Sequence, residues 1–387
     1  MRLISADGRW WWNGREWQPL PKAVDAEGSE GSTGSTGSAG STAVVSEAAP
    51  VDRPEAAPSP ADGTPKFMPG QYVKSRTEVP DTGIARRLYD LSGGRINLGP
   101  SAAELRHLRL LNMARTPVSD PPVHLAVASA KGGVGKSTMA LLVASKMGLL
   151  RNDRIIAVEC NPHHGTFRSR VPTHHDRSIK DLIDFLDSSE IDRDQDLTLP
   201  MLHRFTTHVP ESRLEVMTAP TDPRIRKALS ANDYNRVFGV LERYFDIIIL
   251  DLGTGLLDET TKFILERVCD QLVVVAPAEL DGAELGAFTL EFVADSRGVE
   301  WVRERAVVVI NRVVRDTQVD VSGMEGYFRH WVRACLRVSQ DPHLKSGGIF
   351  DWRLISRAAD EEILALTGEV ATGFSLGRSV PGAAEPA

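Results

Sequence analysis

The sequence predicts an α/β fold with a mostly parallel, doubly wound sheet and helices on both of its faces. Two observations lead to this fold class. Continuous apolar runs of strand length alternate with longer segments of helical periodicity, as where Val123 to Ser129 precedes Lys136 to Leu149. A glycine-rich segment joins these two elements. Strands that are apolar throughout are typical of a parallel sheet, because crossover helices cover it on both sides.

Further strands and helices continue the alternation along the chain. Buried strands are expected at Arg154 to Glu159, Leu214 to Thr218, Asp246 to Asp251, Gln271 to Ala276 and Arg305 to Ile310. Helices are expected at Ile179 to Leu186, Pro223 to Arg243, Leu280 to Asp295 and Asp351 to Val370.

Composition narrows the class of protein. The 387 residues are 42% hydrophobic and 25% charged, with a net charge of -7. This balance is typical of an ordinary globular protein and provides no overall basic field for nucleic acid. Three scattered cysteines are too few for a disulfide framework or a zinc site, and they indicate a reducing compartment. No apolar run approaches the ~18 residues that cross a bilayer, and the start lacks the apolar stretch of a signal peptide, so we expect a cytoplasmic protein.

Composition also changes along the chain, and it predicts five parts. Residues 23–70 are rich in Gly, Ser, Thr, Ala and Pro, which cannot bury enough apolar surface to fold, so this segment is expected to be a disordered linker. The other parts are a Trp-rich hairpin module at 1–22, a helical lead-in at 71–120 with a helix from Ala102 to Ala114, the main domain at 121–375 and a flexible tail at 376–387.

The N-terminal module holds four of the seven tryptophans. Asn13-Gly14 is a strong signal for a two-residue hairpin turn, which would place Trp12 opposite Arg15 and Trp10 opposite Trp17. This segment resembles short Trp-rich modules that recur in actinobacterial proteins. It is interpreted either as a docking module for a protein partner or as a small core that packs on itself or on the main domain.

The glycine-rich segment predicts a P-loop, because it follows a strand and opens a helix. Glycines let the backbone N–H groups turn toward phosphate oxygens, and the helix N-terminus adds its dipole. Lys136 is expected to reach the β- and γ-phosphates of ATP, and the Ser137 hydroxyl to bind Mg²⁺. The predicted nucleotide-binding residues are Gly132, Gly133, Val134, Gly135, Lys136, Ser137 and Thr138.

Lys131 to Thr138 reads Lys-Gly-Gly-Val-Gly-Lys-Ser-Thr and resembles the deviant Walker A motif of ParA/MinD ATPases. The resemblance covers about residues 90 to 375. It implies that Lys131 crosses to the partner's nucleotide when two ATP-bound subunits form a homodimer. Such a cation would stabilise charge on the γ-phosphate and make dimerisation depend on it. The alternative is a solvated lysine at a strand end.

Two further residues match the family's site. Asp251 ends an apolar strand, as a Walker B carboxylate does, and is expected to hold Mg²⁺ through a water. The glycine-punctuated segment after it would sense the γ-phosphate. Asn311 follows a strand and is similar to the family's adenine-reading asparagine, whose amide matches the purine edge. An ordinary turn residue is the alternative there.

The sequence departs from the family at Glu159-Cys160-Asn161-Pro162, where two aspartates are usual. The later aspartate helps to position the attacking water, and Asn161 can orient water but cannot accept its proton. Slow hydrolysis is therefore predicted, with Lys131, Lys136, Asn161 and Asp251 as the catalytic residues. His163 and His164 are interpreted as loop residues at the rim of the site rather than as bases or metal ligands.

Three looser segments resemble actinobacterial MinD-like ATPases associated with type VII (ESX) secretion. These are Asn97 to Ser101, Asp251 to Gly255, and Asp341 to Leu344 with Gly347-Gly348. The resemblance implies an ATP-dependent switch that dimerises and regulates or positions a partner assembly such as a secretion apparatus.

Two alternatives remain open at this stage. One is a nucleotide-binding scaffold with little turnover, suggested by Asn161. The other is a ParA-like partition ATPase whose dimer binds DNA non-specifically, which needs a basic surface. The candidates for that surface are Arg224, Arg226, Lys227, Arg236 and Arg243 on one expected helix, and Arg329, Arg333 and Arg337, of which the first two would share a helical face.

Overall fold

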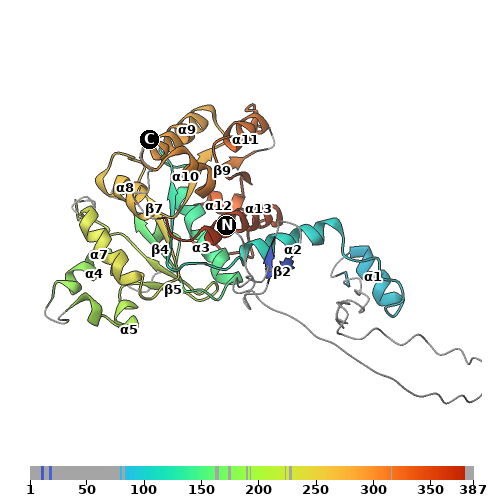
Figure 1. The fold of residues 1–387 in the computed structure, drawn as a ribbon, viewed down its shortest axis with the longest axis horizontal. Helices are drawn as coiled ribbons and strands as arrows, with labels where there is room; N and C mark the ends of the chain where they lie inside the picture. Colours follow the sequence, from blue (N-terminus) through green and yellow to red (C-terminus); the bar gives the residue numbers. More distant parts are fainter. Residues whose placement is uncertain are drawn as a thin grey trace, which may run out of the picture. The chain divides into compact units, whose positions relative to one another are not determined.

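The computed structural model describes residues 10–12, 17–19, 79–80, 83–161, 165–172, 176–188, 191, 193–222, 224–225, 229–314 and 316–379 (Figure 1). The chain separates into two compact units, residues 1–74 and 75–387. The expected linker, 23–70, and His163 and His164 lie outside the described residues.

The first unit contains a short antiparallel hairpin. Strand β1 (Trp10–Trp12) pairs with β2 (Trp17–Pro19), with Trp12 opposite Trp17 and Trp10 opposite Pro19. The predicted pairing of Trp10 with Trp17 is therefore wrong, and the connection has four residues rather than two. The length of the connection sets the register of a hairpin, and four-residue connections are also common. The Asn13-Gly14 signal therefore did not determine the register.

The second unit is built on an eight-stranded sheet of order β10-β9-β8-β3-β7-β4-β6-β5. Only the pairing of β5 with β6 is antiparallel, which confirms the predicted mostly parallel sheet. The strands are β3 (Val123–Ala128), β4 (Ile155–Cys160), β5 (Thr207–Val209), β6 (Leu214–Met217), β7 (Ile247–Leu252), β8 (Gln271–Pro277), β9 (Ala306–Val313) and β10 (Ala334–Ser339).

Helices cover both faces of this sheet, as predicted. Alternate residues of each strand point to opposite faces, so β3 contributes Val123, Leu125 and Val127 to one core and Ala126 and Ala128 to the other. The first core also holds α3 (Lys136–Leu150), α12 (Pro342–Lys345) and α13 (Arg357–Thr372). The second holds α4 (Ile179–Leu186), α5 (Leu199–Leu202), α7 (Ala231–Leu241), α9 (Leu280–Arg297), α10 (Val299–Arg305) and α11 (Val321–Arg329), with α8 (Glu259–Phe263) continued by a π-helix (Ile264–Val268).

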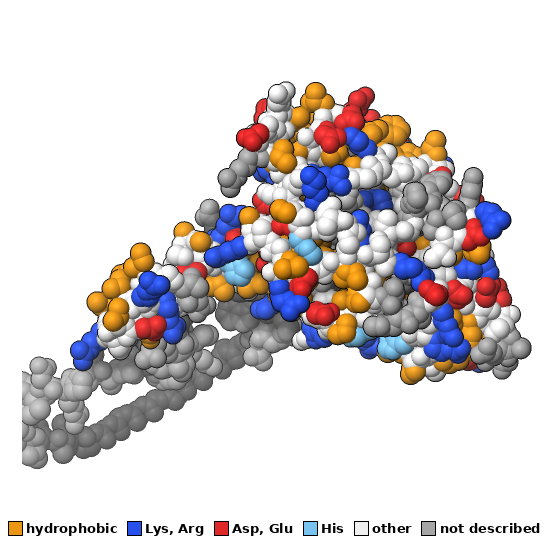
Figure 2. Space-filling model, turned by 180° about the vertical axis from the view of Figure 1, so that it is seen from behind, with side chains coloured by type: hydrophobic (Ala, Val, Ile, Leu, Met, Phe, Trp, Pro, Cys, Tyr) orange, Lys and Arg blue, Asp and Glu red, His pale blue; other side chains and the backbone are white. Residues whose placement is uncertain are grey.

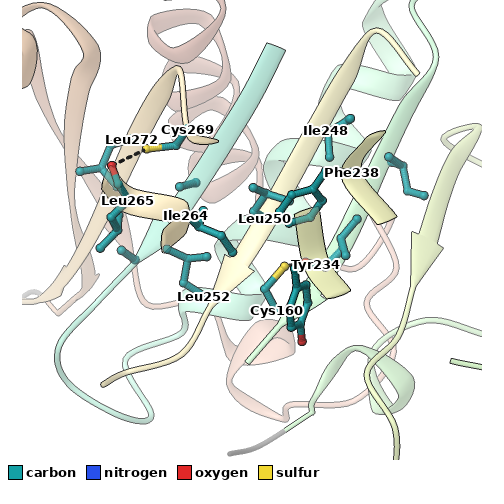
Figure 3. Packing of buried hydrophobic residues seen from close by; sticks show 14 of the residues in the cluster. Cys160, Tyr234, Phe238, Ile248, Leu250, Leu252, Ile264, Leu265, Cys269 and Leu272 are labelled. Atoms are coloured by element: carbon teal, nitrogen blue, oxygen red, sulfur yellow. Dashed lines mark hydrogen bonds between the residues drawn. The ribbon is translucent and has the colours of Figure 1, made fainter. Parts of the chain in front are cut away.

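The second core packs apolar side chains against the middle of the sheet. Figure 3 shows Tyr234 and Phe238 of α7 lying against Ile248 and Leu250 of β7, with Cys160 beside them. All three cysteines are buried and free, as expected for small apolar residues.

Two helices precede β3. These are α1 (Gly83–Leu91) and α2 (Ala102–Ala114), and the bounds of α2 are those predicted. Ser101 and Glu104 form a capping box at its start. Helix α2 packs on α13 through Leu110 and Ala114, so this helix of the lead-in is part of the domain core.

Three sequence predictions about helices are wrong. The single helix expected from Pro223 to Arg243 is interrupted: Arg224 and Ile225 are helical, and a separate helix begins at Ala231, where Ser230 and Asp233 form a capping box. The last helix begins at Arg357 rather than Asp351, because Ser356 caps it. Helix α11 ends at Arg329 and strand β10 follows, so Arg329 and Arg333 share no helical face.

Short 3₁₀ turns complete the described elements, at Phe167–Ser169, Asp194–Asp196 and Gly373–Leu376. The start of the expected tail is held in place, since the Ser379 backbone N–H donates to Asp270 and the Ser379 hydroxyl accepts from Trp301. No helix in the described part of the chain is long and apolar enough to cross a membrane.

Candidate nucleotide-binding site

The P-loop lies at the carboxyl end of β3 and opens α3, as predicted. Gly133 and Gly135 have φ angles of 73° and 94°, in the left-handed region that glycine adopts at little cost. Gly135 is also the N-cap residue of α3. The loop therefore turns its backbone into the start of a 15-residue helix, where N–H groups and the helix dipole attract anions.

Asn311, at the end of β9, braces this loop. Its side-chain Nδ2 donates a hydrogen bond of 2.7 Å to the carbonyl oxygen of Val134, and its side chain is buried. A Cβ atom on Gly135 would lie 2.5 Å from the same Nδ2, so the close approach requires glycine. Asn311 is thus no simple turn residue, and its adenine-reading role stays a prediction.

A buried ion pair joins the two predicted nucleotide motifs. Lys136 Nζ lies 2.6 Å from Asp251 Oδ1, and the two side chains are 6% and 0% exposed. The pair forms because β3 and β7 are neighbours in the sheet, with Val127 opposite Asp251. Asp251 Oδ2 is buried and has no hydrogen-bond partner. An orphaned carboxylate oxygen beside a P-loop fits a cation, so the donor set suits Mg²⁺.

Two cavities meet at the P-loop. The first, here called the P-loop cavity, has a volume of about 420 Å³ and includes Lys136, Ser137 and Asn161 in its lining. The second, here called the Asn311 cavity, has a volume of about 240 Å³ and includes Asn311, Asp341 and Leu344. Gly135, Thr138 and Arg312 line both cavities. The two cavities therefore adjoin at the start of α3.

Lys131 lies at the edge of the P-loop cavity but is held by acidic groups of its own chain. Its Nζ contacts Asp281 Oδ2 at 2.7 Å and also Glu279 Oε2. These hydrogen bonds, to Asp281 and then Glu279, raise the pKa of Lys131. The side chain is 28% exposed, so it is neither freely solvated nor buried.

Asn161 and Glu159 occupy the places where the family has two aspartates. Asn161 is buried and lines the P-loop cavity, where the sequence predicted it. Glu159 does not line this cavity. Its carboxylate accepts hydrogen bonds from the backbone N–H groups of Thr166, Phe167 and Ala219. Burial raises the pKa of Glu159 despite these bonds. Glu159 therefore organises the loop that follows β4.

Sequence reasoning missed several residues of the site. Arg170 and Arg312 line the P-loop cavity, and Glu279 with Asp281 binds Lys131. Arg312 has a φ angle of 60°, which is rare outside glycine and is often found at functional sites. Arg312 could have been found from the sequence, because it directly follows Asn311. Arg170, Glu279 and Asp281 gave no such signal, because only tertiary packing brings them to the site.

The described arginines among the candidates for a DNA-binding surface have partners within the chain. Arg236 binds Asp187 and Asp194, Arg243 donates to backbone carbonyls, and Arg224 binds Asp222. Arg329 and Arg337 both contact Glu325, and Arg333 donates to Thr372. Arg226 and Lys227 lie outside the described residues. On the face drawn in Figure 2, basic side chains are interspersed with acidic and apolar ones.

Comparisons with known proteins give the fold. No protein-family profile matches the chain. The ESX-1 secretion-associated protein EspI of Mycobacterium tuberculosis is 28% identical over 284 residues, which is 72% of this chain and 41% of EspI. The chain thus spans less than half the length of that relative.

Two solved structures are similar in fold. One is a ParA family ATPase from Chlorobium tepidum, with a TM-score of 0.51, 18% identity, and coverage of 63% of this chain and 98% of that one. The other is MinD from Pyrococcus horikoshii, complexed with Mg-ADP, with a TM-score of 0.50, 15% identity, and coverage of 64% and 95%. The chain therefore has the fold of the ParA and MinD P-loop ATPases and is a distant relative of EspI.

Proposed function

We propose that the chain is an ATP-binding and slowly hydrolysing switch that dimerises on ATP and regulates or positions a partner assembly. The observation that carries the proposal is the buried Lys136–Asp251 pair at the P-loop, with one Asp251 oxygen left without a partner. The sequence assigns Lys136 to phosphate and Asp251 to Mg²⁺, and in this structure the two side chains neutralise each other. A phosphate can take the place of Asp251 beside Lys136, and a cation can take the place of Lys136 beside Asp251.

Within this site each residue has a separate task. The backbone N–H groups from Gly132 to Thr138 bind the phosphates, and Lys136 turns from Asp251 to the β- and γ-phosphates. Ser137 and Asp251 would hold Mg²⁺, which neutralises phosphate charge when bound. The similarly folded MinD is complexed with Mg-ADP, which supports this assignment of cofactors.

Hydrolysis is proposed to be slow because Asn161 is neutral. An amide at this place orients water but takes no proton from it, and a general base contributes about 10²- to 10⁴-fold to such a step. The same residue favours a second candidate, a nucleotide-binding scaffold with little turnover. Non-specific DNA binding is the less favoured alternative, because those of its proposed arginines that the structure describes are engaged within the chain.

Dimerisation is proposed to depend on Lys131. To reach a partner's nucleotide, this side chain must break its ion pairs with Glu279 and Asp281. The loss of these ion pairs offsets part of the favourable free energy of dimer formation. The name of EspI suggests secretion as the process, and the Trp-rich hairpin is proposed as the docking module for a protein partner in the cytoplasm.

The test is molecular mass by light scattering with Mg-ATP, Mg-ADP and no nucleotide, for the wild type and for Lys131→Ala. Lys180→Ala is a matched control, because Lys180 also pairs with an acid but lies in α4. We expect a dimer with ATP alone, lost in Lys131→Ala and kept in Lys180→Ala. If the wild type binds ATP and its mass never changes, the switch is refuted and the scaffold remains.

A further inference from the structure

The P-loop cavity is strongly cationic on its walls. Its lining includes Lys131, Lys136, Arg170 and Arg312, and no carboxylate among the residues described. Acidic partners neutralise the two lysines, since Lys136 pairs with Asp251 and Lys131 with Glu279 and Asp281. Neither arginine has an ion pair or hydrogen bond from its side chain in the described part of the chain; Arg312 is exposed and Arg170 is half-buried.

The position of Arg170 is fixed by the loop after β4. Glu159 binds the backbone N–H groups of Thr166 and Phe167, and the Phe167 ring is fully buried. The backbone N–H of Arg170 then donates to the Phe167 carbonyl oxygen at 2.9 Å. Arg170 is half-buried, and its Nε is buried without a partner. An unpaired, partly desolvated guanidinium is costly unless an anion joins it.

Electrostatics at Arg170 agree with its geometry. Burial lowers the pKa of Arg170, attraction from Asp251 and Glu159 opposes this, and repulsion from Arg312 adds to it. The charges of Asp251, Glu159 and Arg312 therefore all act on this guanidinium group. An anion bound at Arg170 would offset both the desolvation and the repulsion.

Arg312 differs from Arg170 in the cavities that it lines. It lies at the end of β9 in a left-handed backbone conformation and lines both the P-loop cavity and the Asn311 cavity. Of these two cavities, Arg170 lines only the P-loop cavity, with Asn161, which the sequence assigns to the attacking water, and Thr254, in the segment that it assigns to the γ-phosphate. Arg170 also lines a further cavity of about 450 Å³ that includes Asp351 and Trp352. The two arginines therefore reach different parts of a bound nucleotide.

We propose that Arg170 binds the terminal phosphate of ATP within its own subunit, and that Arg312 binds the phosphates nearer the base. The proposal rests on the proposed nucleotide site. Guanidinium groups bind phosphate oxygens through two parallel hydrogen bonds and stay charged when partly buried. Recognition of the triphosphate thereby begins in the monomer, before Lys131 of a second copy can contribute.

The experiment measures dissociation constants for Mg-AMP-PNP and Mg-ADP by titration calorimetry. Arg170→Gln and Arg312→Gln remove the charges, and Arg168→Gln is the matched control, because Arg168 is two residues away and already pairs with Asp176. Each variant is also made in a Lys131→Ala background, which removes the proposed contribution from a second subunit.

We expect Arg170→Gln to weaken AMP-PNP binding about 10- to 100-fold and to change ADP binding much less, in both backgrounds, since a charged hydrogen bond of this kind is lost. Arg312→Gln should weaken both nucleotides alike, and Arg168→Gln neither. If Arg170→Gln does not fold, Arg170→Lys serves instead: it keeps the charge, loses the paired hydrogen bonds, and should give a smaller loss confined to AMP-PNP.

Equal effects of Arg170→Gln on both nucleotides, or no effect, would overturn the assignment of Arg170 while leaving the nucleotide site in place. A loss seen only in the Lys131-containing background would overturn binding within one subunit. A wild type that binds neither nucleotide would remove the proposed function itself, and the inference with it.

Discussion

The ion pair between Lys136 and Asp251 gives a prediction that needs no nucleotide. Lys136→Met removes the cation and leaves Asp251, which is fully buried, without its charge partner. Removing one member of a buried pair costs about 3–5 kcal/mol, because the remaining charge is neither solvated nor paired. Asp251→Asn should cost a similar amount, since it leaves a buried ammonium group. The double variant removes both charges, so its cost should fall below the sum by about 2–3 kcal/mol.

The assay is urea unfolding without nucleotide, followed by circular dichroism, for the wild type, both single variants and the double variant. The exposed pair of Lys180 and Asp184, four residues apart on α4, is a matched control cycle. Its coupling should stay below about 0.5 kcal/mol, because water screens exposed charges. Additive costs at Lys136 and Asp251 would refute the reasoning, since they would mean that the two charges do not compensate each other in the folded protein.

Three further predictions concern the same site. Gly135→Ala should abolish ATP binding and lower stability by about 2 kcal/mol or more, because the new Cβ meets Asn311 in a left-handed backbone; titration and urea unfolding would contradict this if both matched the wild type. Asn161→Asp should raise the rate of phosphate release about tenfold or more by restoring a proton acceptor, and an unchanged rate with intact ATP binding would count against that role. The raised pKa of Glu159 means that the folded state holds its proton more tightly, so stability falls as pH rises from about 4 through that pKa. Urea unfolding at a series of pH values should show a smaller fall in the free energy of unfolding for Glu159→Gln than for the wild type. An equal pH dependence in the two proteins would contradict this prediction.

Local pattern was enough to predict the centre of the fold. Consecutive residues are enough to recognise the strands between β3 and β9 that are apolar on both faces. The same holds for the P-loop between β3 and α3. Strands β5 and β10 were missed because they are short or lie at the sheet edges, where burial alternates or is partial. The starts of two helices lie at Ala231 and Arg357 rather than at the predicted residues, because Ser230 and Ser356 cap them there.

The sequence by itself therefore determined the central strands of the sheet, the loop that turns its backbone toward an anion, and two residues of the site, Lys136 at the start of α3 and Asp251 near the end of β7. Only the tertiary structure decided how the charges are arranged. It joined those two residues, bound Lys131 to Glu279 and Asp281, engaged the arginines proposed for DNA, and left Arg170 and Arg312 without partners in the cavity. Charge pairing depends on distances between segments far apart in the chain, which no local pattern of residues records.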